Sequence, residues 1–230
     1  MNKTVFITGT SRGFGYALVE QFLTQGWMVY CLVRNDEDAN KMVQMNSSRC
    51  IPIISDVTSD NLQSDIASSL SSSTTIDVLI NNAGAGSCAK PFTETLVNDV
   101  RKLLDIHCLG ALRVTQAIIP YINNDGVIIN ISSRFGSITK TASGELDNIS
   151  CSYSYRIAKA AQNMFSLCLS REYKNRTIKV CSIHPGKLKT ASASPDADRE
   201  PREAAETLLS LLSKIENGKF YSLFEGEFDW

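Results

Sequence analysis

Continuous apolar runs recur along the chain, separated by stretches in which apolar residues return every three or four positions. A run that is apolar at consecutive positions is typical of a strand in a parallel sheet, because both faces of such a strand are covered. The runs predict seven strands, at residues 4–8, 28–33, 51–54, 78–80, 127–131, 177–183 and 219–223.

The stretches between the runs have the spacing of amphipathic helices. Helices are expected from Ala17 to Gly26 and at about 37–45, 59–71, 96–122 (interrupted near Pro120), 152–173 and 201–214. Alternating strands and helices predict a single α/β domain over residues 1–230, a doubly wound Rossmann arrangement. Its parallel sheet of about seven strands would carry helices on both faces. Residues 191–200 are small and polar and are expected to be mobile.

Composition narrows the class of protein. The formal net charge of −1 gives no electrostatic case for binding nucleic acid or an acidic membrane surface. No apolar run approaches the length of about 18 residues that a membrane span needs, and the N-terminal run is too short for a signal sequence. Seven cysteines without a CxxC pair indicate reduced, mostly buried thiols in a cytoplasmic protein.

A glycine-rich turn connects the first strand to the first helix. Gly9, Gly13 and Gly15 have the spacing GxxxGxG, and glycines allow backbone N–H groups to approach a phosphate. The start of the following helix adds positive potential. Glycines alone would be weak evidence, but their place between a strand and a helix indicates dinucleotide binding.

Tyr155 and Lys159 are four positions apart in the helix expected at 152–173, so both side chains point from one face. Free tyrosine has a pKa near ~10 and exchanges protons poorly at neutral pH. A fixed positive charge favours the phenolate, and lowering the pKa by ~3 units takes ~4 kcal/mol. The pair therefore indicates a general acid or base, although a surface lysine beside a half-buried tyrosine has the same spacing.

Five motifs follow one another along the chain: TGTSRGFG at 8–15, NNAG at 81–84, NISS at 130–133, YRIAK at 155–159 and HPGKLKT at 184–190. Together they closely resemble the short-chain dehydrogenase/reductase family, and the resemblance covers essentially the whole chain. The segments SYSYR and NGKFYSLFEGEFDW look most like the branch that holds C-factor and the sniffer-type carbonyl reductases.

The resemblance implies a role for each matching catalytic residue. Tyr155 would be the general acid in carbonyl reduction, or the base in alcohol oxidation. Lys159 would lower the pKa of Tyr155 and hold the nicotinamide ribose hydroxyls. Ser133, rather than Ser132, would hydrogen-bond the substrate carbonyl oxygen. Because hydride comes from the cofactor, the protein mainly orients and polarises the reactants.

The resemblance also assigns residues to the cofactor. The NNAG motif would pack along the adenosine, Asp56 and Val57 would cap the adenine, and the HPGKLKT motif would surround the nicotinamide carboxamide. Asp56 also fits a simple turn or helix cap. The cofactor-binding positions are Gly9, Ser11, Arg12, Gly13, Phe14, Gly15, Arg34, Asp56, Val57, Asn82, Ala83, Gly84, Tyr155, Lys159, Pro185, Gly186, Leu188 and Thr190.

Two features depart from the family pattern. His107 stands three residues ahead of Gly110, where the family usually has an asparagine that supports a water leading to the lysine. Imidazole can donate and accept hydrogen bonds, so His107 is either part of such a relay or a packed neutral side chain. Ser133 and Tyr155 are 22 positions apart, which is more than is common in the family. The insertion at 137–151 is expected to form a loop beside the substrate pocket.

Two arginines favour NADPH over NADH. An NAD site needs a carboxylate about 20 residues past the glycine turn, where it accepts from the ribose 2′-hydroxyl. Arg34 stands there instead, 19 positions after Gly15, and Arg12 lies inside the turn. Their guanidinium groups are expected to converge on a 2′-phosphate. Acidic residues follow at 36–38, and a two-residue shift would bring Asp36 to the ribose and favour NAD(H).

The expected function is NADP(H)-dependent reduction of a small-molecule aldehyde, ketone or quinone. The alternative is an NADP(H)-binding sensor or signalling protein with little turnover, which the exchange at His107 supports and the intact Ser133, Tyr155 and Lys159 oppose. The pocket would be formed by loops at 86–95, 134–152 and 187–200, whose sequences do not identify the substrate.

A homodimer or homotetramer is expected through the helices at 96–122 and 152–173. Both helices carry apolar residues on more than one face: Leu103, Leu104, Leu109 and Leu112 on the first, and Phe165, Leu167 and Leu169 on the second.

Overall fold

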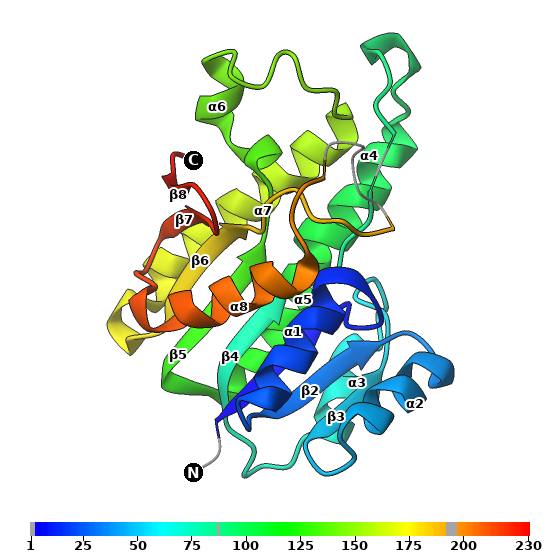
Figure 1. Ribbon diagram of the computed structural model, residues 1–230, viewed down its shortest axis with the longest axis vertical. Coiled ribbons are helices and arrows are strands. Elements are labelled where there is room, and N and C mark those ends of the chain that lie inside the picture. The colour runs from blue at the N-terminus through cyan, green and yellow to red at the C-terminus, as the bar shows by residue number, and fades with distance from the viewer. Residues whose placement is uncertain (1–2, 87, 192–196) are drawn as a thin grey trace.

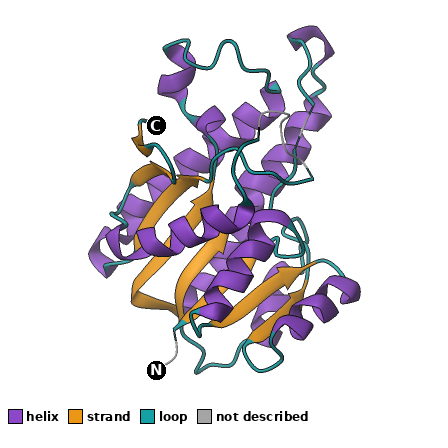
Figure 2. Cartoon of the chain, in the orientation of Figure 1, coloured by secondary structure: helices purple, strands orange, loops and turns teal. Residues whose placement is uncertain are grey.

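The computed structural model describes residues 3–86, 88–191 and 197–230. Its strands form one sheet of eight, in the order β3-β2-β1-β4-β5-β6-β7-β8 (Figures 1 and 2). Strands β1 to β7 pair in parallel, and β8 pairs antiparallel with β7. The strands are β1 Thr4–Thr8, β2 Met28–Val33, β3 Cys50–Ile54, β4 Ile76–Asn81, β5 Ile122–Ile131, β6 Lys179–His184, β7 Lys219–Ser222 and β8 Gly226–Phe228.

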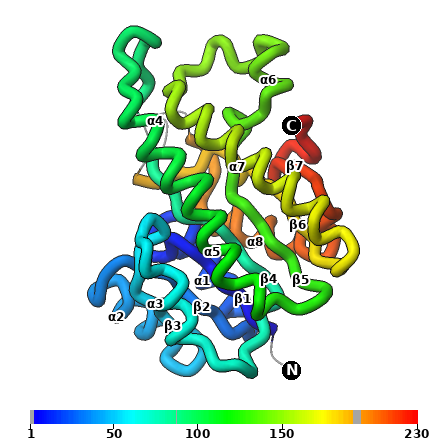
Figure 3. Tube along the Cα trace, turned by 180° about the vertical axis from the view of Figure 1, so that it is seen from behind, coloured from blue at the N-terminus to red at the C-terminus, as the bar shows by residue number. Residues whose placement is uncertain are grey.

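Helices cover both faces of this sheet. Helices α1 and α8 lie in front of the strands in Figure 1, and Figure 3 shows α3, α5 and α7 across the opposite face. The helices are α1 Gly13–Thr24, α2 Asp36–Met45, α3 Leu62–Ser69, α4 Val97–Leu104, α5 Gly110–Ile118, α6 Ile138–Ala142, α7 Tyr153–Glu172 and α8 Pro201–Leu211. The doubly wound Rossmann arrangement is confirmed.

The central strands are buried on both faces, because successive side chains of a strand point to opposite sides. Val5 and Ile7 belong to the apolar layer that includes α1 and α8, whereas Phe6 belongs to the layer that includes α3 and α5. All three side chains are fully buried. This double burial explains why the strands are continuous apolar runs in the sequence.

The order of the strands positions the candidate site. The chain builds β1, β2 and β3 in one direction and then returns to place β4 on the other side of β1. In such sheets ligands bind outside the carboxyl ends of the strands, at the point where the order reverses. The glycine turn, the NNAG motif and Ser133 all follow carboxyl ends of strands near this point.

Two elements differ from the expectation. Strand β8 was not predicted, because three residues are too few to show a period; its Phe228 packs edge-on against Phe220 of β7, with 5.5 Å between ring centroids. The insertion at 137–151, which was expected to be a loop, includes the short helix α6.

The long helix expected at 96–122 consists of four parts. Helix α4 continues into a π-helical turn at Asp105–Leu109, then α5, then a 3-10 turn at Ile119–Tyr121. By length and composition the segment Val97–Tyr121 is one that could cross a membrane, but the core helix of a globular protein meets the same criterion. Here 44% of its most apolar window is buried, and α4 and α5 pack against α7 and α3.

Residues 192–196 of the stretch expected to be mobile lie outside the described residues. At the described end of the stretch, the carbonyl oxygen of Arg199 accepts from the main-chain N–H of Lys189 at 2.9 Å. The ammonium of Lys189 pairs with Glu200 at 2.8 Å. These contacts join the described residues on either side of 192–196.

Candidate active site

The glycine turn brings the end of β1 against the start of α1. Gly9 has φ of +68°, in the left-handed region that glycine adopts without strain. A Cβ atom on Gly15 would overlap the carbonyl oxygen of Gly9, so only glycine allows this approach. Arg12 occupies the N-cap position without making a side-chain cap, Ser11 is half-buried and Phe14 is buried. The turn and the first N–H groups of α1 have the form of a phosphate cradle.

Asn82 and Ala83 fasten this turn to β4. The hydroxyl of Thr8 accepts from the main-chain N–H groups of Asn82 at 3.0 Å and Ala83 at 2.9 Å. The side-chain amide of Asn82 donates to the carbonyl oxygens of Thr8 at 2.9 Å and Gly9 at 3.0 Å. The NNAG motif thus holds the turn in place, and its contact with an adenosine stays a prediction.

Asp56 closes a turn after β3. Its Oδ1 accepts from the N–H group of Thr58 at 2.8 Å and from the hydroxyl of Thr58 at 2.7 Å. Val57 is buried, and its methyl group packs against Gly110 of α5. Asp56 therefore has the turn role that was considered for it, and the capping of an adenine by Asp56 and Val57 stays a prediction.

Arg34 directly follows β2, and its side chain is exposed, as is that of Arg12. Asn35 caps α2 by accepting from the N–H group of Asp38 at 2.8 Å. Asp36 is therefore the first residue of a helix, where carboxylates are favoured by the helix dipole. No two-residue shift occurs, so Arg34 rather than Asp36 stands at the end of the strand.

Ser133 and Tyr155 meet despite the 22 positions between them. Ser133 follows the end of β5, and Ser152 caps α7 by accepting from the main-chain N–H of Tyr155 at 3.1 Å. Ser133 lies close enough to the Tyr155 phenol to lower its pKa. The insertion therefore leaves the Ser–Tyr pair intact.

Lys159 lies one helical turn after Tyr155 and is only 4% exposed. Its ammonium donates to the carbonyl oxygen of Ile131 at 2.6 Å and to Oε1 of Gln162 at 2.9 Å. It lies 5.8 Å from the centroid of the Tyr155 ring. Burial disfavours the charged form and lowers the pKa of Lys159 from 10.5 to about 7.

The expected lowering of the Tyr155 pKa by Lys159 is not found in this structure. Burial raises the pKa of Tyr155 to about 12, and the neighbouring Ser133 opposes this shift only in part. The ammonium of Lys159 is directed at other acceptors, so the lost hydration of a phenolate outweighs its attraction to the lysine. Tyr155, whose side chain keeps some accessible surface, therefore carries its proton at neutral pH.

His107 lies in the π-helical turn and packs edge-on against Tyr155, with 5.4 Å between ring centroids. Its Nε2 lies 2.9 Å from the carbonyl oxygen of Ala85, to which it can donate, and 3.3 Å from the main-chain N–H of Ala85, from which it can accept. Its buried Nδ1 has no partner among the described residues. Burial, and then the charge of Lys159, lower its pKa to about 3. These contacts match the packed neutral interpretation of His107; a relay would have to use Nδ1.

The segment after β6 lies beside the glycine turn. The methyl group of Thr190 is next to Gly13, and Leu188 packs against the apolar layer that includes α1. Pro185 and Gly186 directly follow β6. The structure thus brings the residues expected at the nicotinamide close to those expected at the phosphates.

Two buried side chains of α7 were not predicted as part of the site. Asn163 accepts from the hydroxyl of Ser132 at 2.6 Å and donates to the carbonyl oxygen of Gly136 at 3.1 Å. Gln162 accepts from Lys159. Gln162 and Asn163 stand three and four positions after Lys159, so helical spacing was a signal that could have found them.

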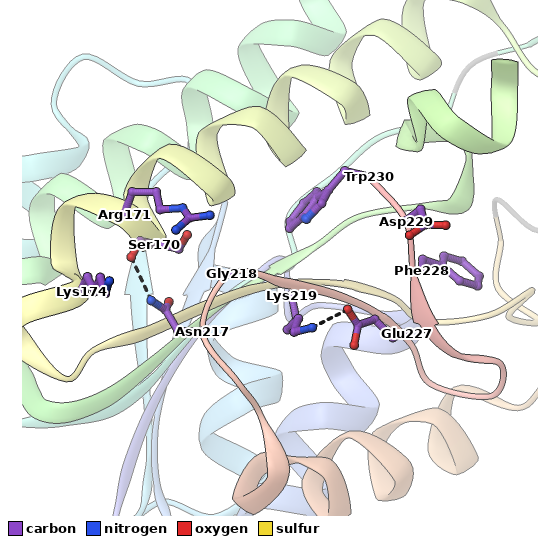
Figure 4. Close-up of a pocket in the computed structure, with 10 residues that line it drawn as sticks. All are labelled: Ser170, Arg171, Lys174, Asn217, Gly218, Lys219, Glu227, Phe228, Asp229 and Trp230. Carbon is purple, nitrogen blue, oxygen red and sulfur yellow. Dashed lines mark hydrogen bonds and ion pairs between the residues drawn. The ribbon is translucent and has the colours of Figure 1, made fainter.

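Two cavities lie near opposite ends of α7. One, of about 530 Å³, is bounded by Ala89, Pro91, Leu146, Ile149 and Tyr153. It therefore lies between two of the loops expected to form the substrate pocket. The other, of about 550 Å³, lies between the C-terminal end of α7 and strands β7 and β8 (Figure 4), and none of the predicted site residues lines it.

Comparisons with known proteins were made for the whole chain. The family model described as short chain dehydrogenase matches residues 3–201. L-fucose dehydrogenase of Mus musculus is 30% identical over 191 residues, which cover 82% of this chain and 66% of that protein. C-signal of Myxococcus xanthus is 28% identical over 160 residues, which cover 67% of this chain and 93% of C-signal.

Among solved structures, the NADPH-bound carbonyl reductase from chicken fatty liver has a TM-score of 0.89 and 25% identity, with 100% of this chain and 99% of that chain covered. The chain spans just under two thirds of the length of the mouse relatives that it matches, 66% in each case. Because the family model matches most of its length, the chain belongs to the short-chain dehydrogenase/reductase family, with a likeness to C-signal and to carbonyl reductase.

Proposed function

We propose that this oxidoreductase reduces the carbonyl group of a small molecule, an aldehyde, ketone or quinone, to an alcohol with NADPH. The observation that carries the proposal is the convergence of Ser133 and Tyr155, with Lys159 one helical turn away. The similar structure from chicken, described as an NADPH-bound carbonyl reductase, supports it.

The residues around the glycine turn fit a dinucleotide. A side chain at Gly15 would fill the space where strand and helix meet, and the N–H groups of α1 have no side-chain cap from Arg12. Arg12 and Arg34 would hold a 2′-phosphate, since both are exposed and no described carboxylate pairs with either. Lys159 would hold ribose hydroxyls. When bound, NADPH supplies the hydride.

In the proposed mechanism, Ser133 donates a hydrogen bond to the substrate carbonyl oxygen and Tyr155 gives that oxygen its proton. A tyrosine whose pKa is about 12 is protonated at neutral pH, which is the state that reduction needs. The raised pKa also weakens it as an acid, and the charge of Lys159 would offset this when the proton is transferred. Once the proton has left, the ammonium of Lys159 would stabilise the phenolate. His107, neutral and packed against Tyr155, would orient the ring.

The second candidate is an NADP(H)-binding sensor or signalling protein with little turnover. It is favoured by His107, which stands where the family usually has an asparagine and whose Nδ1 lacks a partner among the described residues. Such a sensor would bind the cofactor but would lack the proton relay. A wild-type protein that binds NADPH but shows no turnover would favour the sensor.

We further propose that residues 1–230 fold as one domain and that the protein is cytoplasmic. We also propose that it forms a homodimer or homotetramer. Exposed apolar side chains on α7 and on the long helix packed against it are Val97, Leu109, Ile157 and Met164. Leu103, expected on this surface, is buried instead. Exposed apolar side chains on two helices that pack together are typical of protein–protein contact.

The test of the proposed function is NADPH oxidation, followed spectrophotometrically across a panel of aldehydes, ketones and quinones. We expect turnover with at least one class and slower turnover with NADH. Tight NADPH binding with no oxidation by any member of the panel would contradict the reductase and support the sensor.

A further inference from the structure

A row of polar side chains crosses the centre of the sheet. Asn81, Asn130 and Ser182 are register partners on β4, β5 and β6, and all three are buried. The amide of Asn81 donates to Oδ1 of Asn130 at 2.9 Å. Buried polar groups are costly unless they are hydrogen-bonded, so this row needs partners on the covering helices.

Helix α7 supplies those partners. The amide of Asn130 donates to the hydroxyl of Ser166 at 2.8 Å, and the hydroxyl of Ser182 lies 2.9 Å from the same oxygen. Ser166 in turn donates to the main-chain carbonyl of Gln162 at 2.9 Å. The turn of α7 that carries Gln162 is thus tied to three strands of the sheet.

Gln162 faces Lys159 from this anchored turn. Its side chain is 1% exposed, and its Oε1 accepts from the ammonium of Lys159 at 2.9 Å. The carbonyl oxygen of Ile131 is the second acceptor. Among the described residues no carboxylate pairs with Lys159, so these two neutral oxygens are what offsets the cost of burying its charge.

We propose that Gln162 is a positioning residue that keeps Lys159 charged and fixed one helical turn from Tyr155. Only the expected effect of Gln162 on carbonyl reduction rests on the function proposed above. A hydrogen bond to the charged form of a group favours that form, so the Gln162 oxygen acts against burial.

Three other titratable side chains face Lys159. Tyr155 lies on the same helix, His107 on the π-helical turn and His184 at the end of β6, and the charge of Lys159 acts on both histidines. The pKa values of both histidines are lowered to about 3 and that of Tyr155 is raised to about 12. None of them titrates between pH 5 and 9, so titration of Lys159 can be followed there without interference.

The test is competitive labelling of the cofactor-free protein with acetic anhydride, with Lys159 followed by mass spectrometry from pH 5 to 9. Only the neutral amine reacts, and the wild-type midpoint is expected at about 7. Gln162→Met keeps the size but removes the acceptor, and should lower the midpoint by about one pH unit. Gln162→Glu supplies a carboxylate and should raise it.

Ser170→Ala is the matched control, because it removes a buried hydroxyl of α7 that contacts neither Lys159 nor Gln162, and it should leave the midpoint unchanged. Equal midpoints in wild type, Gln162→Met and Gln162→Glu would overturn the proposal, as would a shift of the same sign in both variants. NADPH affinity and turnover are then measured on the same variants. Shifted midpoints with unchanged turnover would leave the role of Gln162 standing and contradict the role of Lys159 in reduction.

Discussion

At the scale of single residues, burial sets the charges of the candidate site. It lowers the pKa of Lys159 to about 7 and raises that of Tyr155 to about 12. Desolvation therefore shifts the protonation equilibria of both side chains before any cofactor contact. In the proposed direction of reduction this leaves the proton on Tyr155, which would give it to the substrate. The ammonium of Lys159 then depends on neutral acceptors such as Gln162.

We expect Arg34 to decide the preference for NADPH over NADH. Arg34→Ala should weaken NADPH binding by roughly ten- to a hundredfold, since one charge-assisted contact with the 2′-phosphate is lost, and leave NADH binding nearly unchanged. The affinities are measured by fluorescence titration. Asp36→Ala is the matched variant, and it should change neither affinity. An unchanged NADPH to NADH ratio in Arg34→Ala, or a loss of NADH binding in Asp36→Ala, would refute the two-arginine account.

The buried histidines make stability depend on pH. The folded pKa of His184 is about 3, below the unfolded value of 6.5, so the unfolded chain binds the extra proton and stability falls as pH drops from 6.5 towards 3. From pH 7 to pH 5 the wild type should lose about 2 kcal/mol more of its unfolding free energy than His184→Phe. Urea unfolding at the two pH values measures this. Equal losses would show that His184 is not neutral in the fold.

The motifs selected the candidate site residues, but the pKa shifts of these residues needed the structure. Spacing placed Tyr155 and Lys159 on one helix face and Arg34 at a strand end, because those relations are local. The sign of the Tyr155 shift was missed, since burial depends on residues far apart in sequence. Gln162 was missed because its spacing from Lys159 does not show that both side chains are buried and in contact.

At the scale of elements, the insertion at 137–151 is held at its start by the C-terminal tail. The hydroxyl of Ser137 donates to the carbonyl oxygen of Asp229 at 2.8 Å. The main-chain N–H and the hydroxyl of Thr139 donate to the carbonyl oxygen of Trp230 at 3.0 and 2.7 Å. The Trp230 ring stacks on Phe220 of β7 at 5.4 Å between centroids. The tail thus couples the sheet edge to the insertion, which forms one wall of the cavity of about 530 Å³.

Trp230→Ala should therefore loosen the insertion. Without the ring stack the tail leaves the sheet edge more often, so amide hydrogen exchange of residues 138–149 should become roughly tenfold faster. Lys219→Met, at the same edge, breaks only the exposed pair with Glu227 and should leave exchange unchanged. Unaltered exchange in Trp230→Ala would mean that the insertion does not depend on the tail.

Long periodic elements were predictable and short or shifted ones were not. Strands β1 to β7 and the major helices occur where apolar spacing placed them. Strand β8 exists only through its pairing with β7, and the π-helical turn at Asp105–Leu109 shifts the helix without changing its apolar pattern. Both depend on contacts that spacing does not record.

At the scale of the molecule, one sheet positions the whole candidate site at the carboxyl ends of its strands, while the exposed apolar side chains of Val97, Leu109, Ile157 and Met164 lie on α7 and the long helix beside it. The first arrangement follows from chain order and was predictable. The second was predictable only in part, because which face of a helix remains exposed is decided by packing, as the burial of Leu103 shows.

The exposed apolar surface predicts the assembly. Wild type should have two or four times the chain mass of 25.3 kDa by light scattering at micromolar concentration. Met164→Glu should reduce the mass to one chain, because a symmetric interface brings the introduced charges together. Lys174→Glu, near the end of the same helix, is the control and should keep the wild-type mass. A single-chain mass for the wild type would refute the proposed oligomer.

The central claim is that Tyr155 gives a proton to a carbonyl oxygen. Its most direct test is single-turnover NADPH oxidation by Tyr155→Phe, with the best substrate of the carbonyl panel and NADPH affinity measured in parallel. We predict a rate roughly a thousandfold below wild type with nearly unchanged NADPH affinity, while Tyr173→Phe, at the far end of α7, keeps the wild-type rate. A Tyr155→Phe protein that retained most of its rate would contradict the account.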